Sequence, residues 1–222
     1  KTRREGPILE ITLDRPKANA IDLTTSRIMG EVFADFRDDP DLRVAILTGA
    51  GEKFFCPGWD LKAAADGDAV DGDYGVGGFG GLQELRDMNK PVIAAVNGPC
   101  IGYGLTGVSF ADFAIASDRA TFSYPEVRIG IPTIVGSIRL PRKLNWADAM
   151  ELLMIGEPVS ADRAKEMGLV WRVVEHDQLM AEAHALADRL VASAPIASRV
   201  VKEVATRTRD MGWTEAVRFG ET

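Results

Sequence analysis

The sequence has few of the residues that build metal centres and nucleophilic relays. Among 222 residues there are two cysteines, Cys56 and Cys100, and two histidines, His176 and His184. Two cysteines are too few for a four-thiolate zinc site, and a chain of this length can bury a core without a disulfide. We therefore expect Cys100 to be a small core residue, both histidines to be structural or solvated, and no bound metal.

Long apolar runs and an excess of positive charge are also missing. The apolar segment Val92–Val96 stops at Asn97 and Gly98, far short of the ~18 residues of a membrane-spanning helix. With 26 Lys and Arg against 33 Asp and Glu, the formal net charge is −7 and no basic stripe is present. These features argue against nucleic acid and membranes as partners. No apolar leader follows the first residues, so we expect a cytoplasmic protein.

Short apolar segments alternate with helical patterns in the first two thirds of the chain. Ile8–Leu13 and Val44–Thr48 predict strands, and the helical spacing of apolar residues in Thr24–Asp38 predicts a helix between them. Pro91–Val96 and Asp112–Ser117 predict two more strands around a glycine-rich turn and a short helix. This alternation predicts an α/β fold with covered sheets.

The pattern changes after Arg142 and becomes mostly helical. Helices are expected at Asp148–Ile155, after the N-cap Ser160, at Gln178–Ser193 and at Pro195–Thr208, with one strand at Leu169–Val174. We therefore divide the chain into a core at 1–145 and a mostly helical C-terminal region at 146–222, which we expect to be incomplete.

Glycine is more abundant than usual, with 22 residues in the chain. Seven of them lie in Asp66–Gly81, together with four aspartates. This stretch predicts a mobile surface loop or, alternatively, a functional lid.

Two glycine patterns match the dinucleotide-binding fingerprint G-x-G-x-x-G, at Gly75–Gly80 and Gly102–Gly107. The first lacks a preceding strand, and fewer than ten residues separate the second from the next strand, too few for a parallel crossover. We reject dinucleotide binding. A glycine turn at a helix N-terminus can instead expose backbone N–H groups, and Cys56–Lys62 contains a second such turn. The two turns could form an oxyanion hole or be ordinary strand-to-helix connections.

Four motifs resemble the crotonase (enoyl-CoA hydratase/isomerase) superfamily: DRPKANA at Asp14–Ala20, FCPGWDLK at Phe55–Lys62, KPVIAAVNG at Lys90–Gly98, and Pro125-Glu126. The similarity runs from Ile8 to the end of the chain. A narrower similarity, to the carnitinyl-CoA dehydratase subfamily, is carried by Ile8–Asp22, Gly49–Phe55 and Gly58–Ala65.

The resemblance implies a spiral of ββα units with a helical C-terminal region that builds a homotrimer, or a hexamer as a dimer of trimers. It implies an acyl-CoA substrate and no metal or redox cofactor, because CoA is part of the substrate. The thioester oxygen would lie between the backbone N–H groups of Trp59 and Tyr103. The substrate-binding residues would be Lys17, Ala20, Asp60, Leu61 and Lys62.

The catalytic positions depart from the family pattern. Hydratases of this family place two glutamates around a water molecule, and here Glu126 is present whereas Thr106 stands at the position of the first glutamate. Threonine can hydrogen-bond water but cannot act as a base at neutral pH. Tyr103 adds a large side chain where the family has none, and Gly130–Gly136 looks one residue shorter than its usual counterpart.

Three functions remain open from the sequence. The first is an enoyl-CoA hydratase or dehydratase of the carnitine type, in which Glu126 transfers protons and Thr106 orients water. The second is an enoyl-CoA isomerase that uses Glu126 alone. The third is a CoA-thioester-binding protein that has lost catalysis.

Overall fold

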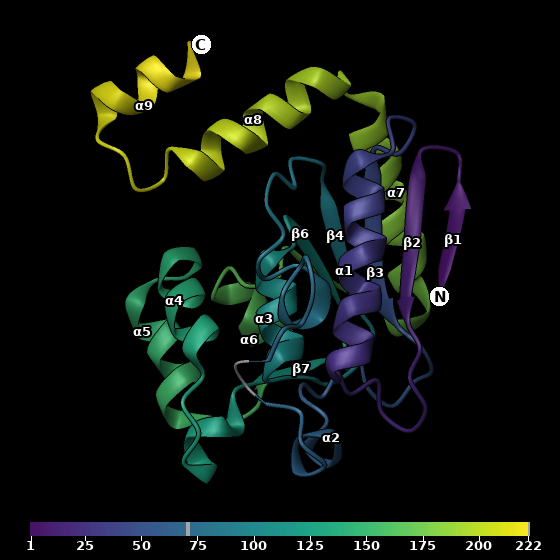
Figure 1. Ribbon diagram of the computed structural model, residues 1–222, viewed down its shortest axis with the longest axis vertical. Coiled ribbons are helices and arrows are strands. Elements are labelled where there is room, and N and C mark those ends of the chain that lie inside the picture. The colour runs from purple at the N-terminus through teal and green to yellow at the C-terminus, as the bar shows by residue number, and fades with distance from the viewer. Residues whose placement is uncertain (70–71, 222) are drawn as a thin grey trace.

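The computed structural model describes residues 1–69 and 72–221, and two β-sheets form its framework (Figure 1). The main sheet has the strand order β1 (Thr2–Glu5), β2 (Ile8–Leu13), β3 (Val44–Gly49), β4 (Val92–Val96), β6 (Phe113–Ser117) and β9 (Arg172–Val174). Only the β1–β2 pair is antiparallel among the described strands of this sheet. A smaller sheet contains β5 (Cys100–Ile101), β7 (Thr121–Ser123) and β8 (Val159–Ser160).

Helices connect and cover these sheets. The α-helices are α1 (Leu23–Asp38), α2 (Leu61–Ala65), α3 (Tyr103–Phe110), α4 (Ile134–Lys143), α5 (Trp146–Met150), α6 (Ala161–Glu166), α7 (Leu179–Ala192), α8 (Pro195–Arg207) and α9 (Trp213–Gly220). Shorter helical turns are η1 (Phe79–Gly81), η2 (Pro125–Ile129), the π-turn η3 (Glu151–Ile155) and η4 (His176–Gln178). Over the described residues, the helices are too short or too polar to cross a membrane.

Consecutive residues of the central strands point to opposite faces of the main sheet, and a different helix covers each face. Leu47 of β3 lies in the same core cluster as Phe33 of α1. Its neighbour Ile46 lies in a second cluster, with Leu186 of α7. Both faces of β3 are buried, which explains why its sequence is an almost unbroken apolar run. The predicted α/β fold with covered sheets is confirmed.

The N-caps follow the expected chemistry. The Asp22 side chain accepts a hydrogen bond from the Thr25 N–H at the start of α1. Ser160 caps α6 in the same way, by accepting from the Arg163 N–H at 3.2 Å. Both ends are therefore fixed by the side-chain oxygen that precedes the helix.

Some predicted boundaries change. The expected helix at Asp148–Ile155 begins at Trp146 and ends in the π-turn, while the strand expected at Leu169–Val174 starts only at Arg172. Leu169 and Val170 are buried in the core but are not paired as strand residues. Apolar burial, which the sequence pattern detects, is thus not the same as strand pairing.

The cysteines and histidines occupy structural positions. Cys56 and Cys100 are both free and buried, and each belongs to the main core cluster. The His176 Nδ1 lies 3.0 Å from the hydroxyl of Ser117, and His184 pairs with Glu10. These placements confirm the core position of Cys100 and the structural interpretation of both histidines.

The glycine-rich stretch Asp66–Gly81 is only partly a surface loop. Val70 and Asp71 lie outside the described residues, so the prediction is not tested there. Tyr74 is only 5% exposed, and the Gly80 N–H donates to the hydroxyl of Ser26 in α1 at 3.0 Å. The prediction of a surface loop is therefore wrong for most of the segment from Tyr74 to Gly81, which packs against α1 and leaves only the Val76 side chain largely exposed.

The chain ends in two helices that contribute no buried residue. Figure 1 shows α8 and α9 at one end of the molecule, beyond the sheet. Ile196, Val201 and Trp213 expose most of their side-chain surface there. These apolar groups face solvent in the single chain.

We expect Phe33→Ala to lower the free energy of unfolding by about 3–5 kcal/mol, because it removes a fully buried ring between α1 and the sheet. Urea unfolding followed by circular dichroism measures this. Ile28→Ala on the same helix is the control: Ile28 is 55% exposed, so the change should stay within about 0.5 kcal/mol. Equal losses in both variants would contradict this assignment of the core face.

Candidate functional site

The site begins where the chain leaves β3 and β4, two neighbouring parallel strands whose carboxyl ends lie together. After these strands, Cys56 and Cys100 form a parallel bridge, and the Ile101 N–H donates to the Cys56 carbonyl at 2.9 Å. A Cβ on Gly58 would lie 3.2 Å from the Tyr103 nitrogen, so the two glycine turns pack directly on each other. The topology thus brings together the two turns that the sequence singled out.

The backbone around Trp59 directs its N–H toward the second turn. The Ile21 N–H donates to the Gly58 carbonyl, and the Asp60 N–H donates to the Ile21 carbonyl, both at 2.8 Å. In an extended segment successive peptide groups point to opposite sides, so the Trp59 N–H points away from Ile21. It has no hydrogen-bond partner among the described residues.

Tyr103 supplies the second free N–H because it is the first residue of α3. Donors in the first turn of a helix have no intrahelical acceptor, and the helix dipole adds positive potential there. Gly102 precedes it with φ +54° and provides no side-chain cap, which leaves the Tyr103 N–H unpartnered within the described chain. Two free donors on adjacent turns can bind one oxygen that carries negative charge.

Glu126 lies against this second turn. It follows Pro125 in η2, and its Oε1 is so close to Gly102 that any Cβ there would collide with it. Its Oε2 is buried without a hydrogen-bond partner in the described part of the chain. Burial raises the pKa of Glu126, because the charged form loses solvation. A carboxyl group of this kind can both accept and return a proton near neutral pH.

Thr106 lies one turn further along α3 and is only 3% exposed. Its hydroxyl lies 2.8 Å from the hydroxyl of Tyr124, the residue immediately before Pro125. The hydroxyl of Tyr124 is itself buried, and burial raises its pKa far above the usual value. The position expected for a second carboxylate is therefore occupied by a pair of neutral hydroxyl groups.

Trp59, Tyr103, Thr106 and Glu126 line a pocket of about 480 Å³. Five buried side-chain polar atoms lack a partner in the described residues, and four belong to residues that line this pocket. The four are Trp59 Nε1, Tyr103 OH, Glu126 Oε2 and Thr133 Oγ1. Buried polar groups are costly without a partner, so the pocket is built for a ligand or ordered water.

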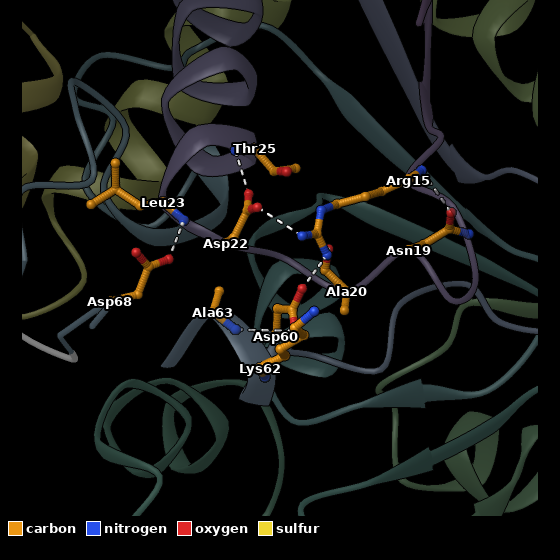
Figure 2. A network of polar contacts seen from close by, with 10 residues as sticks. All are labelled: Arg15, Asn19, Ala20, Asp22, Leu23, Thr25, Asp60, Lys62, Ala63 and Asp68. Atoms are coloured by element: carbon orange, nitrogen blue, oxygen red, sulfur yellow. Dashed lines mark hydrogen bonds and ion pairs between the residues drawn. The ribbon is translucent and has the colours of Figure 1, made fainter. Parts of the chain in front are cut away.

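Arg15 ties together the segments beside the first turn, as Figure 2 shows. Its guanidinium contacts Asp22 at 2.8 Å and Asp60 at 2.5 Å, and it donates to the Ala20 carbonyl at 3.1 Å. Asp60 also accepts from the Lys62 N–H at the start of α2. The hydrogen bond from Arg15 holds the pKa of Asp60 below its usual range, so the ion pair persists at neutral pH. The network holds the backbone that follows Trp59 against the segment that leads into α1.

The residues expected to bind CoA fall into two groups. Leu61 is 66% exposed and lines the pocket, whereas Lys17, Ala20, Asp60 and Lys62 lie outside its lining, on the two segments tied by Arg15. The Lys17 and Lys62 side chains are exposed and make no ion pair with the described residues. The Asp60 carboxylate is engaged by Arg15 and by the Lys62 N–H at the start of α2.

Sequence reasoning missed three contributors to the site: Arg15, Phe79 and Tyr124. Arg15 lies inside the DRPKANA motif, and Tyr124 directly precedes Pro125, so both had a usable signal. Phe79 lies in the glycine-rich stretch, and nothing in its local pattern shows that its ring lies 4.5 Å from that of Tyr103.

Comparison with known proteins agrees with this geometry. A sequence model of the enoyl-CoA hydratase/isomerase family matches residues 3–220. Carnitinyl-CoA dehydratase from Salmonella arizonae is 55% identical over 97% of this chain and 83% of its own length, and that from Citrobacter koseri is 54% identical over the same shares.

Two solved structures are similar over the whole fold. An enoyl-CoA hydratase from Mycobacterium marinum has a TM-score of 0.92 at 34% identity, covering 99% of this chain and 86% of that one. A carnitinyl-CoA dehydratase from Mycobacterium avium has a TM-score of 0.87 at 35% identity, covering 100% and 90%. The chain therefore belongs to the enoyl-CoA hydratase/isomerase family, as a carnitinyl-CoA dehydratase-like enoyl-CoA hydratase with the α/β crotonase fold.

Proposed function

We propose that this chain catalyses the reversible hydration of an enoyl-CoA with a carnitine-type acyl group, using Glu126 as its single proton-transferring carboxylate. One observation carries the proposal: a half-buried carboxyl group with a raised pKa lies against a turn that presents a free backbone N–H. The similarity to carnitinyl-CoA dehydratases supports the acyl class.

The thioester oxygen binds to the N–H groups of Trp59 and Tyr103. This polarises the carbonyl and draws electrons from the β-carbon of the conjugated double bond. Glu126 takes a proton from water while the water oxygen bonds to the β-carbon, and the resulting enolate charge rests on the thioester oxygen. Glu126 then gives that proton to the α-carbon. One water molecule has been added, and the carboxylate is restored.

Thr106 orients the attacking water in this scheme. Its hydroxyl is held by Tyr124 at 2.8 Å and can offer an oxygen to the water without exchanging a proton at neutral pH. Thr106 and Tyr124 can therefore position water as a second carboxylate would, but they cannot transfer its proton.

A second function, enoyl-CoA isomerisation, uses the same groups. Glu126 is the only carboxylate among the described pocket-lining residues, and moving a double bond from C3 to C2 needs one base that removes and returns a proton. It differs from hydration in that no water is consumed.

The CoA portion of the substrate lies along the segments that border Trp59. Leu61 contributes apolar contact at the pocket, and the unpaired ammonium groups of Lys17 and Lys62 neutralise phosphate charge. Arg15 contacts both the Ala20 carbonyl and the Asp60 carboxylate, and in this way it fixes the two segments along which CoA binds.

We propose a homotrimer, with a hexamer as two paired trimers, in which the C-terminal part of 146–222 forms the contacts. The exposed apolar side chains of α8 and α9, among them Ile196, Val201 and Trp213, support this. Exposed apolar side chains that lie together on a single chain mark a surface that binds another protein, and here we propose another copy of this chain.

We expect Glu126→Gln to lower kcat for hydration of crotonobetainyl-CoA by about 10²–10⁴-fold, because glutamine cannot transfer the proton. Loss of the enoyl-thioester absorbance measures the rate. Glu157→Gln is a matched control, since its carboxylate is exposed and pairs only with Arg128 among the described residues. Full activity of Glu126→Gln would overturn the proposal, and migration of the double bond in a 3-enoyl-CoA without hydration would favour the isomerase.

The pH profile of kcat/KM should have an acid limb set by the Glu126 carboxylate. Both directions start from the Glu126 carboxylate, so kcat/KM should rise with pH through a pKa above the ordinary glutamate value of 4.5. Initial rates with the enoyl and the hydroxyacyl thioester, measured from pH 4 to 9, test this. A basic limb in kcat/KM would show that a group that must be protonated also takes part, and a profile without an acid limb would contradict the role of the Glu126 carboxylate.

Thr106→Val and Tyr124→Phe should each lower kcat about tenfold while KM changes little, because each removes one hydroxyl that positions water. Steady-state kinetics with crotonobetainyl-CoA give both parameters, and a near-ultraviolet spectrum checks the fold. Unchanged kcat in both variants would remove Thr106 from the mechanism. A rise in KM in place of the fall in kcat would show that the two hydroxyl groups shape the binding pocket and do not position water.

A further inference from the structure

Four aromatic rings form one wall of the pocket. Trp59, Tyr74, Phe79 and Tyr103 all line it, although they come from three separate segments of the chain. The Phe79 ring centre lies 4.5 Å from that of Tyr103, 5.0 Å from that of Tyr74 and 6.5 Å from that of Trp59. Its plane is inclined by 77°, 74° and 89° to these rings. The rings thus stand as walls at steep angles rather than as a flat stack.

The backbone is shaped to hold these rings. Gly80 has φ +69°, and a Cβ there would collide with the Tyr103 ring, so a glycine lets this ring pack beside Phe79. Tyr74 is nearly buried, and its hydroxyl donates to the Ala69 carbonyl at 2.6 Å. Trp59, Phe79 and Tyr103 keep part of their surface exposed. Tyr74 therefore supports the cluster from behind.

The pocket lining carries negative charge and no positive charge among the described residues. Its lining among the described residues contains no lysine, arginine or histidine, and Glu126 is the only carboxylate. The Tyr103 hydroxyl does not ionise, since burial raises its pKa. An acyl group with a negative charge would find no counter-charge here. A positive group would meet aromatic faces, which are negative, and a carboxylate.

The position of the rings matches the length of a short acyl chain. Trp59 and Tyr103 carry both the rings and the free N–H groups proposed to bind the thioester oxygen. The distal end of a short acyl group held at those N–H groups therefore lies within reach of the rings. In a carnitine-type acyl group the quaternary nitrogen is separated from the thioester carbon by three carbons.

We propose that Trp59, Phe79 and Tyr103 form a subsite for a quaternary ammonium group on the acyl chain, with Tyr74 as its support. The subsite rests on the proposed function, because it takes the substrate to be an acyl-CoA bound at the two N–H groups. It adds to that function a source of selectivity, since a trimethylammonium group cannot donate hydrogen bonds and is recognised by aromatic faces.

Two CoA thioesters that cannot be hydrated test the subsite. 4-Trimethylammoniobutanoyl-CoA carries the cation, and 5,5-dimethylhexanoyl-CoA has the same shape with carbon in place of nitrogen. Titration calorimetry should show about 10- to 30-fold tighter binding of the cationic thioester by the wild-type chain. Equal affinities would overturn the subsite.

Variants locate the preference in the rings. Phe79→Leu and Tyr103→Leu should bring the affinity ratio of the two thioesters close to one, because leucine keeps apolar bulk but has no aromatic face. Ile129→Leu, which changes a pocket residue outside the ring wall, is the control and should keep the ratio. An unchanged ratio in both aromatic variants would overturn the assignment.

A shape-preserving substitution guards against misfolded variants. Trifluorophenylalanine in place of Phe79 weakens the negative face of the ring at almost constant size, so the affinity ratio should fall while binding of the neutral thioester is kept. A ratio that stays at the wild-type value would again overturn the subsite. Neither thioester can be hydrated, so binding and catalysis are tested separately. If the chain does not hydrate crotonobetainyl-CoA but still prefers the cationic thioester, only the proposed reaction is refuted. If it hydrates that substrate but binds the two thioesters equally, only the subsite is refuted.

Discussion

The site depends above all on the packing of one glycine turn on another. Gly58 adopts φ +94°, and a Cβ there would press on the Ile101 carbonyl and the Tyr103 nitrogen, so any other residue would strain this approach. The pairing of β3 with β4 places both turns at the same edge of the sheet. Everything else in the site is arranged around this contact, because it fixes where two free N–H groups lie.

The side chains around this contact are positioned by the same backbone features that form the two turns. Glu126 reaches the site only because Gly102 has no side chain, and Thr106 is placed by the helix that Gly102 opens. On the other side, Arg15 joins Asp22 and Asp60, which start α1 and α2. The two ion pairs are partly shielded from solvent, so they hold geometry better than exposed pairs do. The positions of the two free N–H groups are therefore a property of the scaffold.

The sequence predicts the parts of this structure that depend on local pattern. The buried strands, the helix that becomes α1 and the N-cap at Ser160 can all be recognised from short segments, and the Pro125-Glu126 motif marks where a carboxylate enters the site. It does not predict β1, whose residues Thr2–Glu5 are polar and exposed and pair only at the sheet edge, nor α4, which contains Pro141. The ring contacts of Phe79 also escape prediction, because they depend on segments far apart in the chain.

With Thr106 where a second carboxylate is expected, a charge on the substrate can have a larger effect on the pKa of Glu126. Burial alone would keep Glu126 protonated to higher pH, and among the described residues that line the pocket no second carboxylate raises its pKa further by repulsion. A quaternary ammonium held against the rings of Phe79 and Tyr103 would bring a permanent positive charge into the same pocket, which favours the carboxylate form. Binding a cationic acyl group would thus lower the pKa of Glu126 and generate the base when the substrate is in place. A neutral acyl group of the same shape would leave the base more protonated, so selectivity would arise in the chemical step as well as in binding.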